Sequence, residues 1–156
     1  MFDAVNFVNT NLDQTRREGL LLEGQRQLTE RLSLGGQYSF TDSEYRDGPF
    51  EGNEVPGVSR HSASAHLDYL ILPGLNGRVE ALYTGGYYLF SDDAHSQPRE
   101  GGYTLLNAAL TYDYQQFTSK LRVNNLTGKQ YDAYASPYGR YPAPEEEVQL
   151  SVGYRF

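Results

Sequence analysis

The chain is 156 residues long, carries a formal net charge of −7 and contains no cysteine. The absence of cysteine excludes disulfide bonds, thiolate metal sites and cysteine catalysis, and the acidic balance argues against a nucleic-acid partner, which would need a basic surface. No run of about eighteen apolar residues occurs, so the sequence predicts no transmembrane helix.

Segments in which apolar and polar residues alternate recur along the whole chain. In chain order they are Phe2–Asn9, Thr15–Leu28, Leu32–Thr41, Arg60–Ile71, Leu75–Tyr87, Tyr103–Tyr114, Phe117–Asn125 and Glu147–Phe156. The first is the weakest, and Leu21 and Arg26 fall on the unexpected faces of the second. A period of two residues is that of a β-strand with one apolar face. We therefore predict an all-β protein of about eight strands.

The predicted connections alternate between short and long. The short ones are Thr29–Arg31, Leu72–Gly74 and Gln115–Gln116. The long ones, rich in Gly, Pro, Ser and acidic residues, are Asp42–Val58, Leu89–Gly102 and Asp132–Glu146. Asn11–Gln14 is short but falls on the long-loop side. Short periplasmic turns and long extracellular loops are typical of an antiparallel transmembrane β-barrel, which is the fold that we predict.

Each predicted strand has one apolar and one polar face, and this pattern fits two kinds of barrel. A membrane barrel would turn the apolar strips to lipid and the polar face to its lumen, whereas a soluble lipocalin-like barrel would do the reverse. Small residues in the strips, such as Ala65 and Ala81, favour the membrane, because a packed interior would have to fill those gaps. Tyrosines near strand ends favour it too.

The polar face offers pairings but no catalytic machinery. His66 and Asp68 lie on it together and could couple as a proton pair, although a lumenal contact is the preferred interpretation. We also expect Lys120 or Arg122 to pair with Glu23, Glu80 or Asp68 across the lumen. Ser62 and Ser64 share the face with His66, but nothing indicates an oxyanion hole or an exposed nucleophile, so no enzyme activity and no cofactor are predicted.

The C-terminal segment ends on an aromatic residue that completes an apolar strip. The strip consists of Val148, Leu150, Val152, Tyr154 and Phe156. In an outer-membrane barrel this strip would face lipid and its last ring would lie at the membrane interface. It resembles the C-terminal signal that the outer-membrane assembly machinery reads. A strand of a soluble sheet is the alternative.

The segment Lys120–Tyr131 carries the most specific pattern in the chain. It reads Lys-Leu-Arg-Val-Asn-Asn-Leu-Thr-Gly-Lys-Gln-Tyr and resembles the "v-x-N-L-t-d-k-x-Y" segment near the end of TonB-dependent receptors, the outer-membrane importers of siderophores, cobalamin and similar chelates. The matching residues are Asn125, Leu126, Thr127, Lys129 and Tyr131. Gly128 stands where the family usually has Asp.

Other stretches resemble the same family in the same order. They are the hairpin with Asn9 and Thr15–Glu23, the stretch Val55–His61 that leads to Tyr69, the strand Tyr103–Tyr112, and the ending Tyr154–Phe156. The resemblance covers nearly the whole chain. It implies the final eight or so strands of a barrel that normally has roughly 22 and a plugged lumen.

The resemblance also implies a location and partners. It implies the bacterial outer membrane, contact with lipid and lipopolysaccharide, and an iron-chelate ligand. We expect one domain over residues 1–156 without a signal peptide, plug domain or first strands, so TonB would act only through the missing plug and the chain alone would not transport. A stand-alone small barrel with a structural or adhesive role, whose eight strands could close on themselves, remains an alternative.

The long loops contain the expected ligand contacts. These are Tyr134, Tyr138, Arg140, Tyr141 and His95. The alternative is a solvated acidic rim that divalent ions bridge to lipopolysaccharide. Asp92, Asp93 and His95 could supply oxygen and imidazole ligands, but no second ligand set is visible, so no metal site is predicted.

Overall fold

A computed structural model describes residues 2–3, 8–9 and 13–156, and these residues form eleven β-strands. The strands are β1 (Phe2–Asp3), β2 (Val8–Asn9), β3 (Thr15–Gln27), β4 (Leu32–Tyr45), β5 (His61–Leu72), β6 (Leu75–Thr84), β7 (Tyr103–Tyr114), β8 (Phe117–Asn124), β9 (Asp132–Ser136), β10 (Gly139–Pro142) and β11 (Glu147–Tyr154). Among the described residues no helix is long and apolar enough to cross a membrane.

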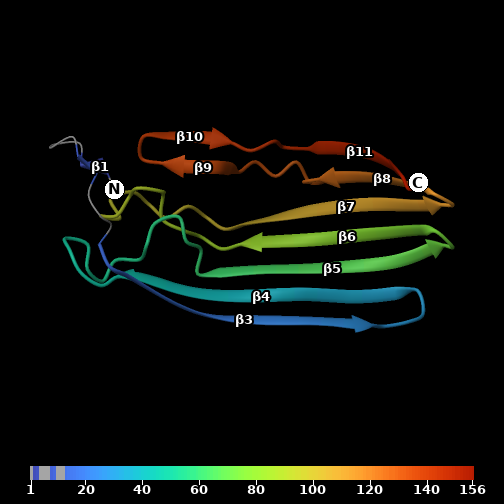
Figure 1. The fold of residues 1–156 in the computed structure, drawn as a ribbon. Coiled ribbons are helices and arrows are strands. Elements are labelled where there is room, and N and C mark those ends of the chain that lie inside the picture. Colours follow the sequence, from blue (N-terminus) through green and yellow to red (C-terminus); the bar gives the residue numbers. More distant parts are fainter. Residues whose placement is uncertain (1, 4–7, 10–12) are drawn as a thin grey trace.

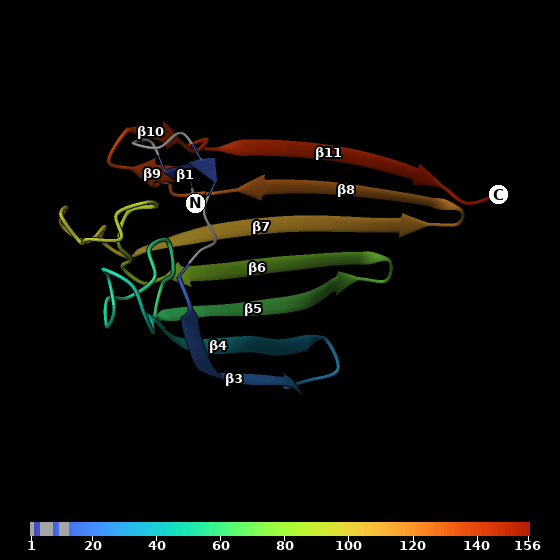
Figure 2. The same cartoon turned by 60° about the vertical axis from the view of Figure 1, so that its left-hand side comes forward.

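Seven strands form one antiparallel sheet in the order β11-β8-β7-β6-β5-β4-β3. Figure 1 shows these strands side by side, with the short turns at one end and the long connections at the other. Figure 2 shows the same single sheet from another side. The sheet is open in the described part of the chain, since its edge strands β3 and β11 do not pair with each other. Separate hairpins pair β1 with β2 and β9 with β10.

The register sorts apolar and polar residues onto opposite faces of the sheet. Leu67 lies opposite Val79, which lies opposite Ala108 on the next strand. The neighbouring register line carries Arg78 opposite Ala109 and, on its other side, Asp68. The strands keep this alternation, with Leu21 and Arg26 of β3 as exceptions. One face is therefore largely apolar and the other predominantly polar.

The apolar face has no layer packed on it within the described residues. Leu150, for example, is 73% exposed, and large exposed apolar side chains occur on every strand of the sheet. From residue 13 to residue 156 the only buried apolar residues are Tyr45, Leu89 and Ala135. A sheet of this size in water would bury its apolar face against a second layer. A face in contact with hydrocarbon has no such need. The structure therefore agrees with the predicted all-β transmembrane fold.

Aromatic rings gather at the short-turn end of the apolar face. Phe117 and Tyr154 lie 4.9 Å apart between ring centroids, and Phe156 packs edge-on against Tyr154 at 5.4 Å. The pairing of β11 with β8 keeps Val148, Leu150 and the rest of the C-terminal strip on this face. An aromatic belt is expected where such a face meets the headgroup layer. The role of the strip as an assembly signal remains a prediction.

The polar face carries an ion-pair network across neighbouring strands. Arg78 donates two hydrogen bonds to Asp68, at 2.6 and 2.9 Å, and His66 Nε2 lies 3.7 Å from the same carboxylate. Arg122 on β8 pairs with Glu80 on β6 at 3.4 Å, over the intervening strand β7. These two partners were predicted, but the contact runs along one wall and not across the lumen. These contacts satisfy polar groups along the wall without an apolar core.

Three details differ from the sequence prediction. The segment Asp132–Glu146 is predicted only as a long connection, but it contains the paired strands β9 and β10, with Arg140 opposite Ala135. The expected strand Leu32–Thr41 continues to Tyr45, because its polar last residues pair with the start of β3 outside the apolar band. The expected strand Phe2–Asn9 lies partly outside the described residues, and its described parts, β1 and β2, pair with each other rather than with the sheet.

Candidate ligand-binding site at the long-loop end

The turn after β8 is organised by the buried side chain of Asn125. Its Oδ1 accepts a hydrogen bond from the backbone N–H of Lys129 at 2.9 Å, and its Nδ2 donates to the carbonyl oxygens of Lys129, at 2.9 Å, and Pro144, at 3.4 Å. The backbone N–H of Asn125 donates to Asn107 Oδ1 on β7 at 2.9 Å. Asn125 adopts a left-handed φ of 53°, which Asn tolerates better than most residues. One side chain thus fixes how the chain leaves the sheet and where Tyr131 lies.

The rest of the family motif supports the same turn. The N–H of Leu126 donates to the carbonyl of Leu106 at 2.7 Å, and that of Gly128 donates to the carbonyl of Asn125 at 2.9 Å. Gly128 has a φ of 58°, and a Cβ there would meet no heavy atom within 4 Å. The space at this position would therefore also hold the Asp that the family usually has there, and glycine leaves the turn unchanged.

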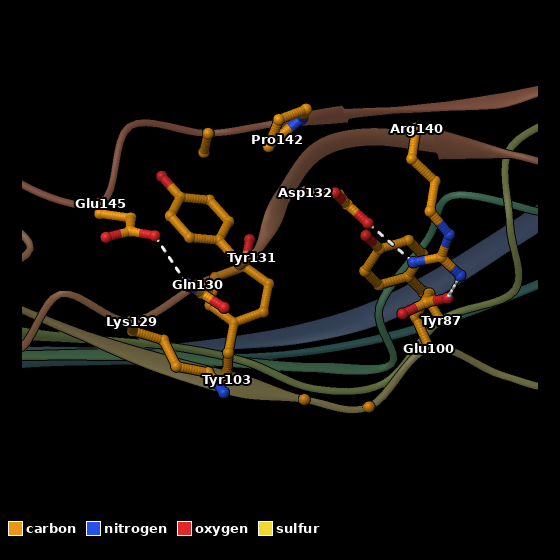
Figure 3. A pocket seen from close by; sticks show the side chains of 13 residues that line it. Tyr87, Glu100, Tyr103, Lys129, Gln130, Tyr131, Asp132, Arg140, Pro142 and Glu145 are labelled. Carbon is orange, nitrogen blue, oxygen red and sulfur yellow. Dashed lines mark hydrogen bonds and ion pairs between the residues drawn. The ribbon is translucent and has the colours of Figure 1, made fainter.

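A cavity of about 550 Å³, the rim cavity, lies between this turn, the β9–β10 hairpin and the connection from β6 to β7. Its walls include the side chains of Tyr87, Glu100, Tyr103, Lys129, Gln130, Tyr131, Asp132, Arg140 and Glu145. Figure 3 shows these residues around the space. The rings of Tyr103 and Tyr131 stack with centroids 4.7 Å apart. Four separate stretches of sequence thus converge on one hollow.

Arg140 binds two carboxylates within the rim cavity. It donates to Glu100 and, at 2.7 Å, to Asp132 (Figure 3). The hydrogen bonds to Glu100 and Asp132, together with the charges of both groups, raise the pKa of Arg140 above its ordinary value. One donor on each of its two terminal nitrogens is therefore engaged by the protein.

The electrostatic surroundings of the cavity also act on Tyr87. Burial raises the pKa of this phenol, and the neighbouring Tyr103, Glu100 and Asp132 raise it further, while Arg140 opposes them. Burial is the main cause of this rise and the nearby acids add to it, and both disfavour a further negative charge in the cavity.

The expected ligand contacts of the hairpin divide into different environments. Arg140 lines the rim cavity. Tyr134 stacks on Phe90 with centroids 4.9 Å apart, and the N–H of Phe90 donates to the carbonyl of Ala135 at 2.9 Å. Tyr138 is 89% exposed at the tip of the hairpin, and Tyr141 is also exposed. The structure brings only Arg140 of this group into the cavity.

His95 lies apart from the rim cavity in the contact between two long loops. Its ring stacks on Tyr88 with centroids 3.5 Å apart, and its Nε2 lies 2.8 Å from the carbonyl oxygen of Glu54. Arg99 pairs with the carboxylate of Glu54 at 2.9 Å and lies over the other partner of the stack, Tyr88. These contacts use His95 to join the loops.

The two neighbouring aspartates also have structural partners. Tyr45 donates a hydrogen bond to Asp93, and the Asp92 carboxylate accepts from Ser96 Oγ and from the N–H groups of Ser96 and Gln97. Burial pushes the pKa of Asp92 up, but these hydrogen bonds outweigh it and hold the pKa below its ordinary value. Among the residues that the structure describes, no three His, Cys, Asp or Glu side chains gather as metal ligands.

Of the residues that line the cavity, only Arg140 was predicted from the sequence as a ligand contact. Those that were not include Tyr87, Glu100, Tyr103, Asp132 and Glu145. Tyr103 carried a usable signal, because its position in the alternation places an aromatic ring on the polar face of β7. Glu100 had no such signal, since its pairing with Arg140 joins residues that lie 40 positions apart.

Comparison with known proteins identifies relatives of the chain. A sequence model of the family "TonB dependent receptor-like, beta-barrel" matches residues 1–126. The ferrichrome outer membrane transporter/phage receptor of Escherichia coli K12 is 31% identical over 97% of this chain and 21% of its own length. The ferrioxamine receptor of Yersinia enterocolitica is 30% identical over 89% of this chain and 21% of its own length.

Solved structures share the fold. The closed form of the ferric-catecholate import receptor Fiu from E. coli K12 matches with a TM-score of 0.73 and 22% identity over 91% of this chain and 21% of that one. The unliganded ferric citrate transporter FecA matches with a TM-score of 0.72 and 20% identity over 87% and 23%. The chain thus spans about a fifth of the length of the relatives that it matches. It belongs to the TonB-dependent receptor β-barrel family, whose members are receptors and transporters of the bacterial outer membrane and not enzymes.

Proposed function

We propose that the chain is the C-terminal barrel portion of a receptor that takes up iron–siderophore chelates, and that the rim cavity captures the chelate on the extracellular side. The observation that carries the proposal is the cavity itself. Its volume of about 550 Å³ lies within the range of small-molecule sites, and it combines stacked rings with a few placed polar groups. Two relatives named for ferrichrome and ferrioxamine support the ligand class.

The unpaired edge strands of the sheet support the proposal that this chain is part of a larger barrel. Inside a bilayer, backbone N–H and C=O groups need partners, so a spanning sheet must have no free edge. In the described residues β3 and β11 each have a strand on one side only. Partner strands from outside this chain would satisfy them, which favours the segment over a stand-alone barrel.

The polar face of the sheet would contact a plug domain in the complete receptor. In the proposed receptor, the ion pairs Asp68–Arg78 and Glu80–Arg122 line the lumenal wall against the plug, and TonB acts on that plug. This chain then supplies the wall and the chelate site but does not transport alone. The lipid-facing strip of β11 serves assembly, and the outer surface meets lipid and lipopolysaccharide.

A binding experiment on the complete receptor that contains this chain tests the proposal. Tyr131→Ala removes the ring shared by the stack with Tyr103, and Tyr138→Ala removes an exposed ring outside the cavity. The first change should weaken equilibrium binding of ferrichrome or ferrioxamine B to outer membranes by about tenfold, an effect of about 1.4 kcal/mol within the range for a well-packed aromatic contact. The second should leave binding nearly unchanged. Equal effects of the two variants would refute the placement of the site.

A further inference from the structure

Acids outnumber bases in the lining of the rim cavity. The carboxylates are those of Glu100, Asp132 and Glu145, and the cations are Lys129 and Arg140. Arg140 is held by Glu100 and Asp132 together, so this cluster keeps one uncompensated negative charge. Lys129 offsets one further negative charge in this count, and the Glu145 carboxylate accepts a hydrogen bond from the neutral amide of Gln130 at 2.6 Å. The cavity as a whole is therefore anionic at neutral pH.

The one arginine in the cavity is already paired with two carboxylates. An arginine that recognises carboxylate or catecholate oxygens uses its planar N–H donors, often two at once. In Arg140 these donors point at Glu100 and Asp132, as Figure 3 shows. An anionic ligand would have to displace a carboxylate to reach them, and it would leave that carboxylate without its partner.

The aromatic groups of the cavity favour the opposite charge. Tyr87, Tyr103 and Tyr131 present ring faces and edges to the space. The face of a tyrosine ring attracts a cation within about 6 Å of its centroid, and the attraction grows when the site is partly desolvated. Rings flanked by carboxylates form a suitable surface for an ammonium group.

The neighbouring loop residues extend the same field. The described stretch from Asp42 to Glu54 and the stretch from Asp92 to Glu100 carry more acids than bases, and the chain has a net charge of −7. A surface of one charge sign raises the local concentration of oppositely charged ligands and repels like-charged ones. The loops around the cavity thus carry the same sign of charge as its lining.

We infer from these arrangements that the rim cavity selects chelates of zero or positive net charge, above all a ferric trishydroxamate that carries a free ammonium group, and rejects multiply charged anionic chelates. This inference rests on the chelate-binding function proposed above. In the bound state the ammonium lies against the tyrosine rings, near Glu145, while Glu100 and Asp132 keep Arg140 turned away from the ligand.

The test uses three probes on outer membranes that contain the complete receptor: ferrioxamine B as the cation, ferrichrome as the neutral chelate and a ferric tris-catecholate as the anion. Dissociation constants are measured by competition at low and high salt. The expected order of affinity is cation, neutral chelate, anion. Added salt should weaken binding of the cation and leave the neutral chelate nearly unaffected.

Glu145→Gln and Glu146→Gln form a matched pair, because both remove one negative charge from adjacent exposed positions and only Glu145 lines the cavity. Glu145→Gln should weaken binding of the cation roughly twofold to fivefold, as expected for a partly exposed ion pair. It should not weaken binding of the neutral chelate, and Glu146→Gln should change neither.

The outcomes separate this inference from the proposed function. If the anionic chelate binds as tightly as the cation, or if the two glutamine variants behave alike, the charge inference is overturned while chelate uptake stands. If none of the three chelates binds, the proposed function itself fails, and the inference with it.

Discussion

The seven-stranded sheet and the long-loop end of this chain are stabilised by different kinds of interaction. In the sheet, alternating residues and backbone ladders determine the structure, and the apolar face depends on hydrocarbon rather than on specific side-chain partners. At the long-loop end, individual side chains such as Asn125, Glu54 and Arg140 each make several defined contacts. The apolar face of the sheet should therefore tolerate apolar substitutions but not a charge, whereas the loops should depend on particular hydrogen bonds.

The largest expected effect comes from a charge on the lipid-facing side of the sheet. Leu121→Arg places a cation between Leu110 and Leu150 and should destabilise the folded receptor by about 2–4 kcal/mol. Thr111→Arg, on the opposite face of the adjacent strand, should cost less than 1 kcal/mol, since that face is already polar. Denaturant unfolding in lipid vesicles measures both. Similar losses for the two variants would contradict the assignment of the faces.

A smaller effect is expected from the buried side chain that organises the turn. Asn125→Ala leaves the N–H of Lys129 and two carbonyl oxygens without their partner and should cost about 1–3 kcal/mol. Because the damage is local, amide hydrogen exchange should accelerate at residues 126–132 and leave β5 and β6 unchanged. Thr127→Ala, at an exposed position of the same turn, serves as the control. Uniform acceleration across the sheet would argue against a local role.

The loop that holds Asp92 should respond to pH. The folded pKa of Asp92 lies below its ordinary value, so its carboxylate stabilises the loop above the unfolded pKa, and this contribution is lost as the pH falls through the lowered folded value. Protease cleavage of residues 92–97 should therefore increase as the pH drops below about 4. The variant Asp92→Asn should be cleaved more readily at neutral pH and lose most of this pH dependence. An unchanged pH profile in the variant would exclude Asp92 as the cause.

The smallest effect is expected at the position where the chain departs from its family. Gly128→Asp should change stability by no more than about 0.5 kcal/mol, because the site is open and Asp tolerates a left-handed backbone. Gly128→Val should cost about 1–2 kcal/mol, because a β-branched side chain clashes with the backbone at this φ. Thermal unfolding of the two variants compares them directly. Equal stabilities would mean that the turn adopts another conformation.

The same contrast explains what the sequence could predict. Alternation in segments such as Arg60–Ile71 was sufficient to locate the strands and even to place Leu21 and Arg26 on the unexpected faces, as their pairing with Ser39 and Leu34 confirms. The β9–β10 hairpin was missed, because Asp132–Glu146 lacks a clear apolar alternation and its pairing outside the apolar band depends on local contacts. The cavity could be predicted only in part, since Glu100 and Asp132 reach Arg140 through the folded loops.

The connection between β6 and β7 has neighbours on both sides. It touches the end of β4 through the Asp93–Tyr45 hydrogen bond and the preceding loop through the Arg99–Glu54 ion pair. It touches the β9–β10 hairpin through Phe90 and Glu100. A substitution in this central segment must suit two unrelated surfaces at once, whereas a change at the hairpin tip, such as one at Tyr138, meets only water. Substitutions should therefore accumulate first at exposed positions such as the tip of the β9–β10 hairpin, and new ligand preferences should arise there. The connection between β6 and β7 should keep its shape.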